Sequence, residues 1–168
     1  MDPFRVVTTL FRVSKRLRRR STRRVIIPVP DQRLTTEWLS LRKTYFPERL
    51  DLDLYTICWS KKRQKRTLAS CNIRKKLVNV AKEMSHPKAL EYLPALLYHE
   101  MCHAALGEGI EVRRGKRMWH GDSFKRLEAR HPGILELKKW MRAGGWHHVV
   151  LSERARVSYL KREKRSCA

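Results

Sequence analysis

Several patterns are missing from this 168-residue sequence, and each absence excludes a class of protein. The four cysteines, at positions 58, 71, 102 and 167, form no Cys-x-x-Cys pair, which excludes a zinc ribbon or knuckle. They suggest no disulfide framework, so a reducing cytoplasm is the expected compartment. No apolar run approaches the length of a membrane span, and the N-terminus lacks the apolar core of a secretory signal. We therefore expect a cytoplasmic protein without a membrane partner.

Acidic residues are also scarce. The chain has 16 of them against 39 Lys and Arg, which gives a formal net charge of +23. That excess is far beyond what solubility requires, so it predicts a polyanionic partner, most simply DNA or RNA bound without sequence specificity. Association with a nucleoid would be compatible with such a partner. The remaining composition, with 42% hydrophobic residues, suits one folded domain with an adequate core.

A run of basic residues lies at each end of the chain, and these two runs divide it into three parts. We expect a basic, flexible arm over residues 1–24, a folded domain over 25–150 and a basic tail over 151–168. A further basic run forms a turn inside the domain. The candidate nucleic-acid contacts are Arg18, Arg19, Arg20, Arg23 and Arg24 in the arm, and Lys61, Lys62 and Arg63 in the turn.

Helices and strands are both expected inside the domain, which indicates an α+β fold with a small antiparallel or mixed sheet. One helix starts at a cap provided by Thr35 or Thr36, carries Trp38, Leu41 and Tyr45 on its apolar face, and ends at Phe46-Pro47. Further helices are expected over about 88–92, 122–131 (capped by Asp122 or Ser123) and 134–141. Strands are expected over 52–59, about 67–71 and about 73–80, and the ambiguous segment 146–150 is compatible with another short strand.

The most informative stretch runs from Leu93 to Gly107. Pro94 suits the first turn of a helix, where its missing N–H costs nothing, and Gly107 suits the C-terminal stop. The residues between them are apolar nearly all round, so this helix is expected to be buried. His99 and His103 are four residues apart and project from the same face. Because unpaired burial of polar groups is costly, these side chains need partners, and a bound metal supplies one.

The residues His99-Glu100-Met101-Cys102-His103 form the pattern His-Glu-x-x-His. Two imidazoles one helical turn apart can bind the same zinc ion, and Glu100 then lies where it can reach a water on that ion and act as general base. The small residues Cys71 and Cys102 are expected to be packing residues rather than ligands or nucleophiles. We predict one catalytic Zn²⁺ held by His99 and His103, with Glu100 as the catalytic residue.

A catalytic zinc also needs a third protein ligand, and several residues compete for that place. A third histidine six residues after His103 would indicate a metzincin, but Gly109 stands there. Glu128 is a candidate of the thermolysin type, and His131 is a weaker one. His120 lies just before a helix, and Gly121 beside it would let the backbone approach the metal closely.

Taken together, Leu-x-His99-Glu-Met-Cys-His103-Ala and Trp119-His120-Gly-x-x-Phe124 resemble the SprT-like, Spartan-related zinc metallopeptidases. Ala69-Ser70-Cys71-Asn72 resembles the strand that precedes the metal helix in this family, and the similarity spans roughly residues 34–140. The resemblance implies a zincin-like domain with a small sheet packed on the metal helix. It implies His99, His103 and His120 as zinc ligands and Glu100 as catalyst. It further implies peptide-bond hydrolysis, in some members on proteins crosslinked to DNA.

Two other interpretations remain open at this point. The chain could be a nucleic-acid-binding module whose zinc is purely structural, or a zinc hydrolase that acts on a bond other than a peptide. Glu100 favours catalysis, because a structural site has no use for a base between its ligands. The sequence indicates neither the natural substrate nor the oligomeric state.

Overall fold

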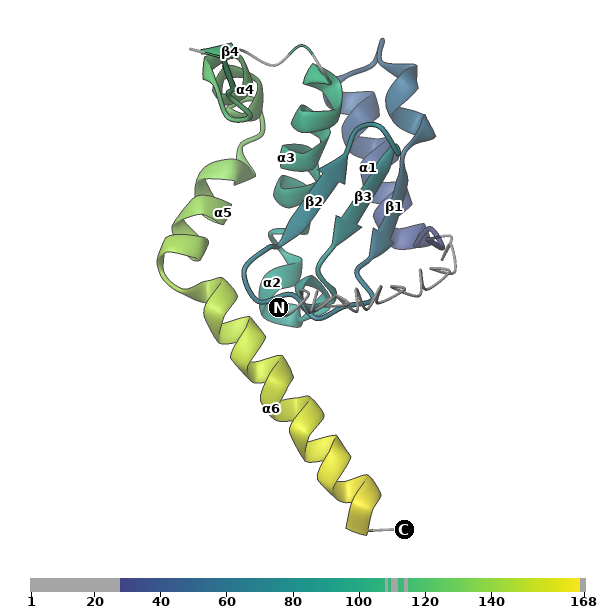
Figure 1. Cartoon of the computed structure of the whole chain (residues 1–168), viewed down its shortest axis with the longest axis vertical. Helices are drawn as coiled ribbons and strands as arrows, with labels where there is room; N and C mark the ends of the chain where they lie inside the picture. Colours follow the sequence, from purple (N-terminus) through teal and green to yellow (C-terminus); the bar gives the residue numbers. More distant parts are fainter. Residues whose placement is uncertain (1–27, 108, 110–111, 114, 167–168) are drawn as a thin grey trace, which may run out of the picture.

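A three-stranded mixed sheet forms one layer of the domain, and helices cover one of its faces (Figure 1). The computed structural model describes residues 28–107, 109, 112–113 and 115–166. The strands are β1 (Thr56–Trp59), β2 (Ala69–Asn72) and β3 (Leu77–Val80), in the order β1-β3-β2. β1 is parallel to the central strand β3, and β2 is antiparallel to it. Because β3 is the central strand, β2 lies at an edge of the sheet. The expected α+β class with a small mixed sheet is confirmed.

Helix α1 (Gln32–Tyr45) packs behind the sheet and has a different cap from the one expected. Asp31 precedes the helix, and its side chain accepts a hydrogen bond from the backbone N–H of Leu34 at 3.0 Å. The prediction that Thr35 or Thr36 would cap the helix is wrong. Both threonines lie within the helix, where their hydroxyls donate to the carbonyl oxygens of Asp31 and Gln32.

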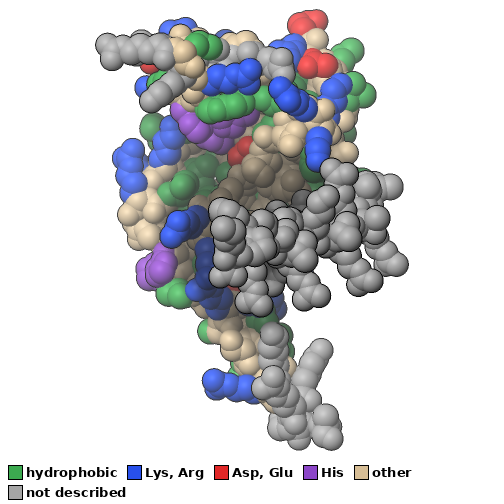
Figure 2. Space-filling model, in the orientation of Figure 1, with side chains coloured by type: hydrophobic (Ala, Val, Ile, Leu, Met, Phe, Trp, Pro, Cys, Tyr) green, Lys and Arg blue, Asp and Glu red, His purple; other side chains and the backbone are tan. Residues whose placement is uncertain are grey.

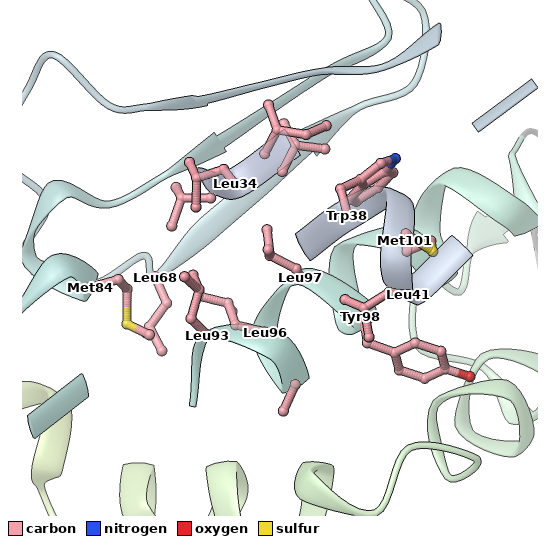
Figure 3. Packing of buried hydrophobic residues seen from close by; sticks show 14 of the residues in the cluster. Leu34, Trp38, Leu41, Leu68, Met84, Leu93, Leu96, Leu97, Tyr98 and Met101 are labelled. Atoms are coloured by element: carbon pink, nitrogen blue, oxygen red, sulfur yellow. The ribbon is translucent and has the colours of Figure 1, made fainter. Parts of the chain in front are cut away.

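Helix α3 (Leu93–Leu106) contacts α1, β2, α4 and α5 and supplies much of the core. Pro94 lies in its first turn, and Gly107 ends it at φ 56°, a left-handed conformation that favours glycine. The expected burial of this helix is confirmed. Figure 3 shows its apolar side chains meeting those of α1 and the sheet layer; the labelled core residues are Leu34, Trp38, Leu41, Leu68, Met84, Leu93, Leu96, Leu97, Tyr98 and Met101.

The strand expected over 52–59 forms only in its second half. Residues Leu50–Leu54 make a 3₁₀ helix, η1, and the strand begins at Thr56. Leu52 is fully buried, whereas Leu50 and Leu54 are each 64% exposed. The indole N–H of Trp38 donates to the Leu52 carbonyl at 2.9 Å, which ties η1 to helix α1. The strand expected over about 67–71 is found at 69–72, and the strand expected over about 73–80 begins only at Leu77, because residues 73–76 turn between the two.

The C-terminal half of the domain is helical apart from one hairpin. The remaining elements are η2 (Lys82–Ser85), α2 (Pro87–Leu90), β4 (Val112–Arg113), β5 (Lys116–Arg117), α4 (Asp122–Glu128), α5 (Gly133–Arg142) and α6 (Gly145–Ser166). The short strand considered over 146–150 is wrong, because Trp146, Val149 and Val150 bury one side of the first turns of α6. Helix α4 is preceded by Gly121 as its N-cap, so Asp122 is its first residue rather than its cap.

Helix α6 continues without a break through residue 150, where the basic tail was expected to begin, and runs away from the rest of the domain (Figure 1). The expected arm over residues 1–24, with Arg18, Arg19, Arg20, Arg23 and Arg24, lies outside the described residues. Within the described part of the chain, no helix combines the length and apolar character needed to cross a membrane.

The burial of Leu97 predicts a large and local stability effect. Leu97 is fully buried in α3, so Leu97→Ala should lower the free energy of unfolding by about 2–5 kcal/mol. Leu135, on α5, is 68% exposed and provides a matched control, since Leu135→Ala removes the same atoms from the surface. Urea unfolding of both variants measures the difference, and equal losses of stability would contradict the assignment of α3 to the core.

Candidate metal centre

Helix α3 places three polar side chains of its sequence on or beside one face. His99 and His103 are both half-buried, and their rings are 5.0 Å apart between centroids. Glu100, between them, is 5% exposed. One turn of helix separates the two histidines, so their common orientation follows directly from their spacing. In the space-filling view, histidine side chains gather around a hollow on this side of the molecule (Figure 2).

His120 approaches the same place from the segment that precedes α4. Its Nε2 atom is 3.2 Å from Nε2 of His103, and one ring nitrogen from each of His99, His103 and His120 lies within 4.8 Å of the others. Two nitrogens bound to one zinc ion at 2.0–2.1 Å and a tetrahedral angle are about 3.3 Å apart. The three histidines therefore fit a metal ion. In the described part of the chain, they are the cluster of possible ligands that could hold one.

Burial favours the neutral, metal-binding form of two of these imidazoles, those of His103 and His120. Burial, followed by the charges of His99 and His120, lowers the pKa of His103 to about 4. Burial and the neighbouring His99 likewise lower the pKa of His120. The ring of Phe124, on α4, packs against all three histidines, with centroid distances of 5.1, 4.4 and 4.8 Å to His99, His103 and His120. Neutral rings with free lone pairs are the state that a divalent metal requires.

Glu128, considered from sequence as an alternative third ligand, lies behind His99 instead. Its Oε1 atom is 2.7 Å from Nδ1 of His99, and its Oε2 atom accepts a hydrogen bond from Nζ of Lys138 at 2.5 Å. Burial raises the pKa of this carboxyl, but the hydrogen bonds from His99 and Lys138 outweigh burial and lower the pKa to about 2. An ionised carboxylate on Nδ1 fixes the ring and leaves Nε2 of His99 for the metal.

His131, the weaker alternative, is not in the cluster. Its ring lies 5.5 Å from that of Tyr45 and 5.1 Å from that of Tyr98, and its Nδ1 accepts the backbone N–H of Gly133. It therefore serves the packing of α1, α3 and α5. The sequence could suggest Glu128 as a metal ligand but not as the partner of His99. The two residues are 29 positions apart, so no local sequence pattern predicts their contact.

The carboxyl group of Glu100 lies beside strand β2, at the backbone of Cys71. Burial raises the pKa of its carboxyl to about 7, while the charge of His99 and the backbone N–H of Cys71 act in the opposite direction. Glu100 and His99 line the same cavity of about 350 Å³, together with Leu68, Ala69, Leu96, Leu137 and Met141. A carboxyl group in this position is next to both the histidine cluster and open space, as a general base requires.

A second cavity, of about 300 Å³, lies at the other end of β2. Cys71, Asn72, Arg117 and Trp119 are among its lining residues. Trp119 is 44% exposed, and its ring lies 6.4 Å from that of His103. The two cavities therefore adjoin opposite ends of the same edge strand, with the histidine cluster close to both.

The cysteines near the site behave as expected of packing residues. Cys102 is fully buried on α3, and Cys71 is half-buried on β2. Burial is the main cause that raises the pKa of each thiol to about 12. Neither thiol is ionised near neutral pH, so neither is suited to act as a nucleophile.

The described residues proposed from sequence as nucleic-acid contacts lie elsewhere. Lys61, Lys62 and Arg63 are exposed on the loop between β1 and β2, and the cavities that they line are not those beside the histidines. Near them lie Lys82, Arg154 and Arg156, which no sequence pattern identifies as members of one group.

An α+β domain with His-Glu-x-x-His on a buried helix and a third histidine from a following segment has the architecture of a zincin-like metallopeptidase. The comparison with protein families assigns residues 35–142 to the SprT-like family. The match covers most of the chain, so the chain belongs to the SprT-like family, and the zincin-like fold class is confirmed. The comparison with curated proteins found no match.

If His120 is the third ligand, its removal should abolish tight metal binding. We expect His120→Ala to reduce zinc affinity by more than about 100-fold, because an entire ligand is lost. The loss of a residue that only hydrogen-bonds to a ligand costs about 100-fold at most. His147, an exposed histidine on α6, gives the control His147→Ala. Competition with a chromophoric chelator measures both affinities. Full zinc affinity and stoichiometry in His120→Ala would exclude His120 as a ligand.

The contact between Glu128 and His99 makes a separate prediction. Glu128→Gln should lower zinc affinity by about 10–100-fold, and Glu128→Ala by more, because the charge and then the whole partner of Nδ1 are removed. Glu136→Gln, at an exposed position of α5, is the control. The same competition titration applies, with circular dichroism to establish that the fold is intact. Unchanged zinc affinity in a folded Glu128→Ala variant would show that Glu128 does not support the ligand.

Proposed function

We propose that this protein is a zinc-dependent metalloendopeptidase that hydrolyses peptide bonds, with His99, His103 and His120 as zinc ligands and Glu100 as general base. The single observation that carries the proposal is the convergence of the three imidazoles beside a buried carboxyl on the same helix. Membership of the SprT-like family supports a metallopeptidase-like domain of this kind. A purely structural zinc site is less consistent with the position of Glu100, since that carboxyl faces a cavity and is not needed to hold the ion.

Strand β2 offers the natural place for a peptide substrate. It pairs with β3 on one side, and no other described strand pairs with it on the side that faces the metal helix. An extended peptide can add to such an edge through main-chain hydrogen bonds, while cavities along the edge receive alternate side chains. The cavity beside Glu100 is lined by Leu68, Leu96 and Leu137, so we expect it to receive an apolar side chain.

The chemistry is divided between the ion and the chain. When bound, zinc supplies Lewis acidity, which polarises the scissile carbonyl and lowers the pKa of water toward about 7. Glu100 takes a proton from the attacking water and returns it to the leaving amine. The hydrogen bond between Glu128 and His99 keeps that ring oriented throughout. The apolar surroundings of Glu100 strengthen its interaction with the proton, since they exclude most of the competing solvent.

The substrates that we propose are proteins bound or crosslinked to nucleic acid. The net charge of +23 supports this, because it would concentrate the enzyme on DNA or RNA and on the proteins attached there. Among the described residues, this proposal is supported by three exposed cations on one loop, Lys61, Lys62 and Arg63. The basic residues of the arm would act in the same direction.

Replacement of the general base tests the reaction. Glu100→Gln should retain zinc and the fold but lose about a hundredfold or more in the rate of peptide hydrolysis, because the amide cannot accept the proton. Cleavage of a DNA-binding protein, in the presence and absence of DNA, measures that rate. Glu91→Gln, an exposed residue just before α3, is the control. Equal hydrolysis by wild type and Glu100→Gln would remove Glu100 from the mechanism.

A further inference from the structure

A groove separate from the metal centre lies between the β1–β2 loop and helix α6. Its cavity has a volume of about 130 Å³. The loop contributes Lys61, Lys62 and Arg63 to its lining, η2 contributes Lys82, and α6 contributes Arg154 and Arg156. We call these six residues the cationic groove. Pockets for small organic ligands usually measure about 300–1,000 Å³, so this cavity suits a group the size of a phosphate on a longer molecule.

Most of the positive charge in the groove is not neutralised by the protein. Two carboxylates also line it: Glu153 pairs with Arg156 at 3.0 Å, and Glu83 accepts the backbone N–H of Gln64 at 3.3 Å. Within the described residues, no acidic side chain forms an ion pair with the remaining cations, which are Lys61, Lys62, Arg63, Lys82 and Arg154. Five cations so close together repel one another, and an external anion would relieve that repulsion.

The loop that carries three of these cations is held in place by hydrogen bonds. The indole N–H of Trp146, on α6, donates to the Lys65 carbonyl at 3.2 Å. Within the loop, the hydroxyl of Ser60 donates to the Lys62 carbonyl, and the side-chain amide of Gln64 donates to that hydroxyl oxygen. The two walls of the groove are therefore fixed relative to each other, which reduces the entropy lost when a ligand binds.

A larger cavity, of about 420 Å³, adjoins the groove and shares Ser60, Lys61 and Lys62 with it. Trp59, which is half-buried, lines it together with the polar side chains of Ser70 and Asn79 on the sheet. A row of cations beside an aromatic ring and polar groups is the combination that binds single-stranded nucleic acid. The cations contact phosphates, and the ring provides a surface for a base.

We propose that the cationic groove binds the phosphate backbone of a single nucleic-acid strand, with Lys61, Lys62 and Arg154 as principal contacts. This inference rests on the nucleic-acid partner proposed above and gives it a location. The loop that forms the groove continues into Arg66, Thr67 and Leu68, which line the cavity beside His99 and Glu100. The same loop therefore connects a nucleic-acid strand bound in the groove with the cavity beside the proposed catalytic residues.

The experiment compares two triple variants of the full chain. One replaces the groove residues, Lys61→Gln, Lys62→Gln and Arg154→Gln. The other removes the same charge from exposed lysines on α1, α4 and α5, Lys43→Gln, Lys125→Gln and Lys139→Gln. Binding of a fluorescent oligothymidylate is measured by anisotropy over a range of salt concentrations. Zinc content and thermal unfolding establish that both variants are folded.

We expect the groove variant to lose at least about tenfold in affinity at low salt, and the log–log salt slope to become shallower by about 2 units, since each phosphate contact contributes about 0.7. The control variant should stay within about twofold of wild type. Equal losses in both variants would overturn the groove while leaving a nucleic-acid partner intact. No oligonucleotide binding by wild type would overturn the groove and that partner together, whereas zinc-dependent hydrolysis would be unaffected.

Vesicles of phosphatidylserine and phosphatidylcholine provide the competing polyanion. If the groove variant loses vesicle binding and retains oligonucleotide binding, the groove is a membrane contact and the proposal is wrong. Comparison of oligothymidylate with a DNA duplex tests whether the groove prefers single-stranded nucleic acid. A duplex that binds as tightly as the single strand, with the same dependence on the three groove residues, would contradict the role given to Trp59 and its cavity.

Discussion

The burial of helix α3 is the constraint on which the rest of the site depends. The helix must fill the core, yet it carries His99, Glu100 and His103. Imidazole and carboxyl groups lose hydration on burial, so each needs a partner supplied by another element. Glu128 provides one for His99, His120 lies against His103, and the backbone of β2 at Cys71 faces Glu100. The elements around α3 are therefore arranged as much by these polar requirements as by apolar packing.

Helix α4 meets that requirement through two adjacent contacts. The hydroxyl of Tyr98 donates to the Leu127 carbonyl at 2.8 Å, and the next residue on each helix completes the contact between His99 and Glu128 at 2.7 Å. Two consecutive contacts fix how far α4 can slide along α3. Lys138, from α5, then closes the arrangement on the other oxygen of Glu128. The orientation of His99 thus depends on three helices and could not be maintained by α3 alone.

These dependencies explain how much of the protein could be predicted from sequence. The spacing of His99 and His103 and the limits of α3 follow from local rules of helix geometry and termination, and the helix was correctly predicted. The 3₁₀ helix η1 and the first turns of α6 could not be predicted in the same way. Both depend on distant contacts, such as that of the Trp38 indole with the Leu52 carbonyl. The contact of Glu128 with His99 is of this distant kind too.

The distribution of charge is governed by the same opposition between burial and solvation. Glu128 can be buried because Lys138 forms an ion pair with it and Nδ1 of His99 forms a hydrogen bond with it, and Arg42 is buried against Asp53 at 2.8 Å. The chain has too few acidic residues to pair with most of its Lys and Arg side chains, so the unpaired cations must remain at the surface. Surface cations repel one another unless something else neutralises them. A polyanion is the simplest agent that would do so for Lys61, Lys62 and Arg154 together, and its binding would therefore stabilise the fold as well as localise the protein.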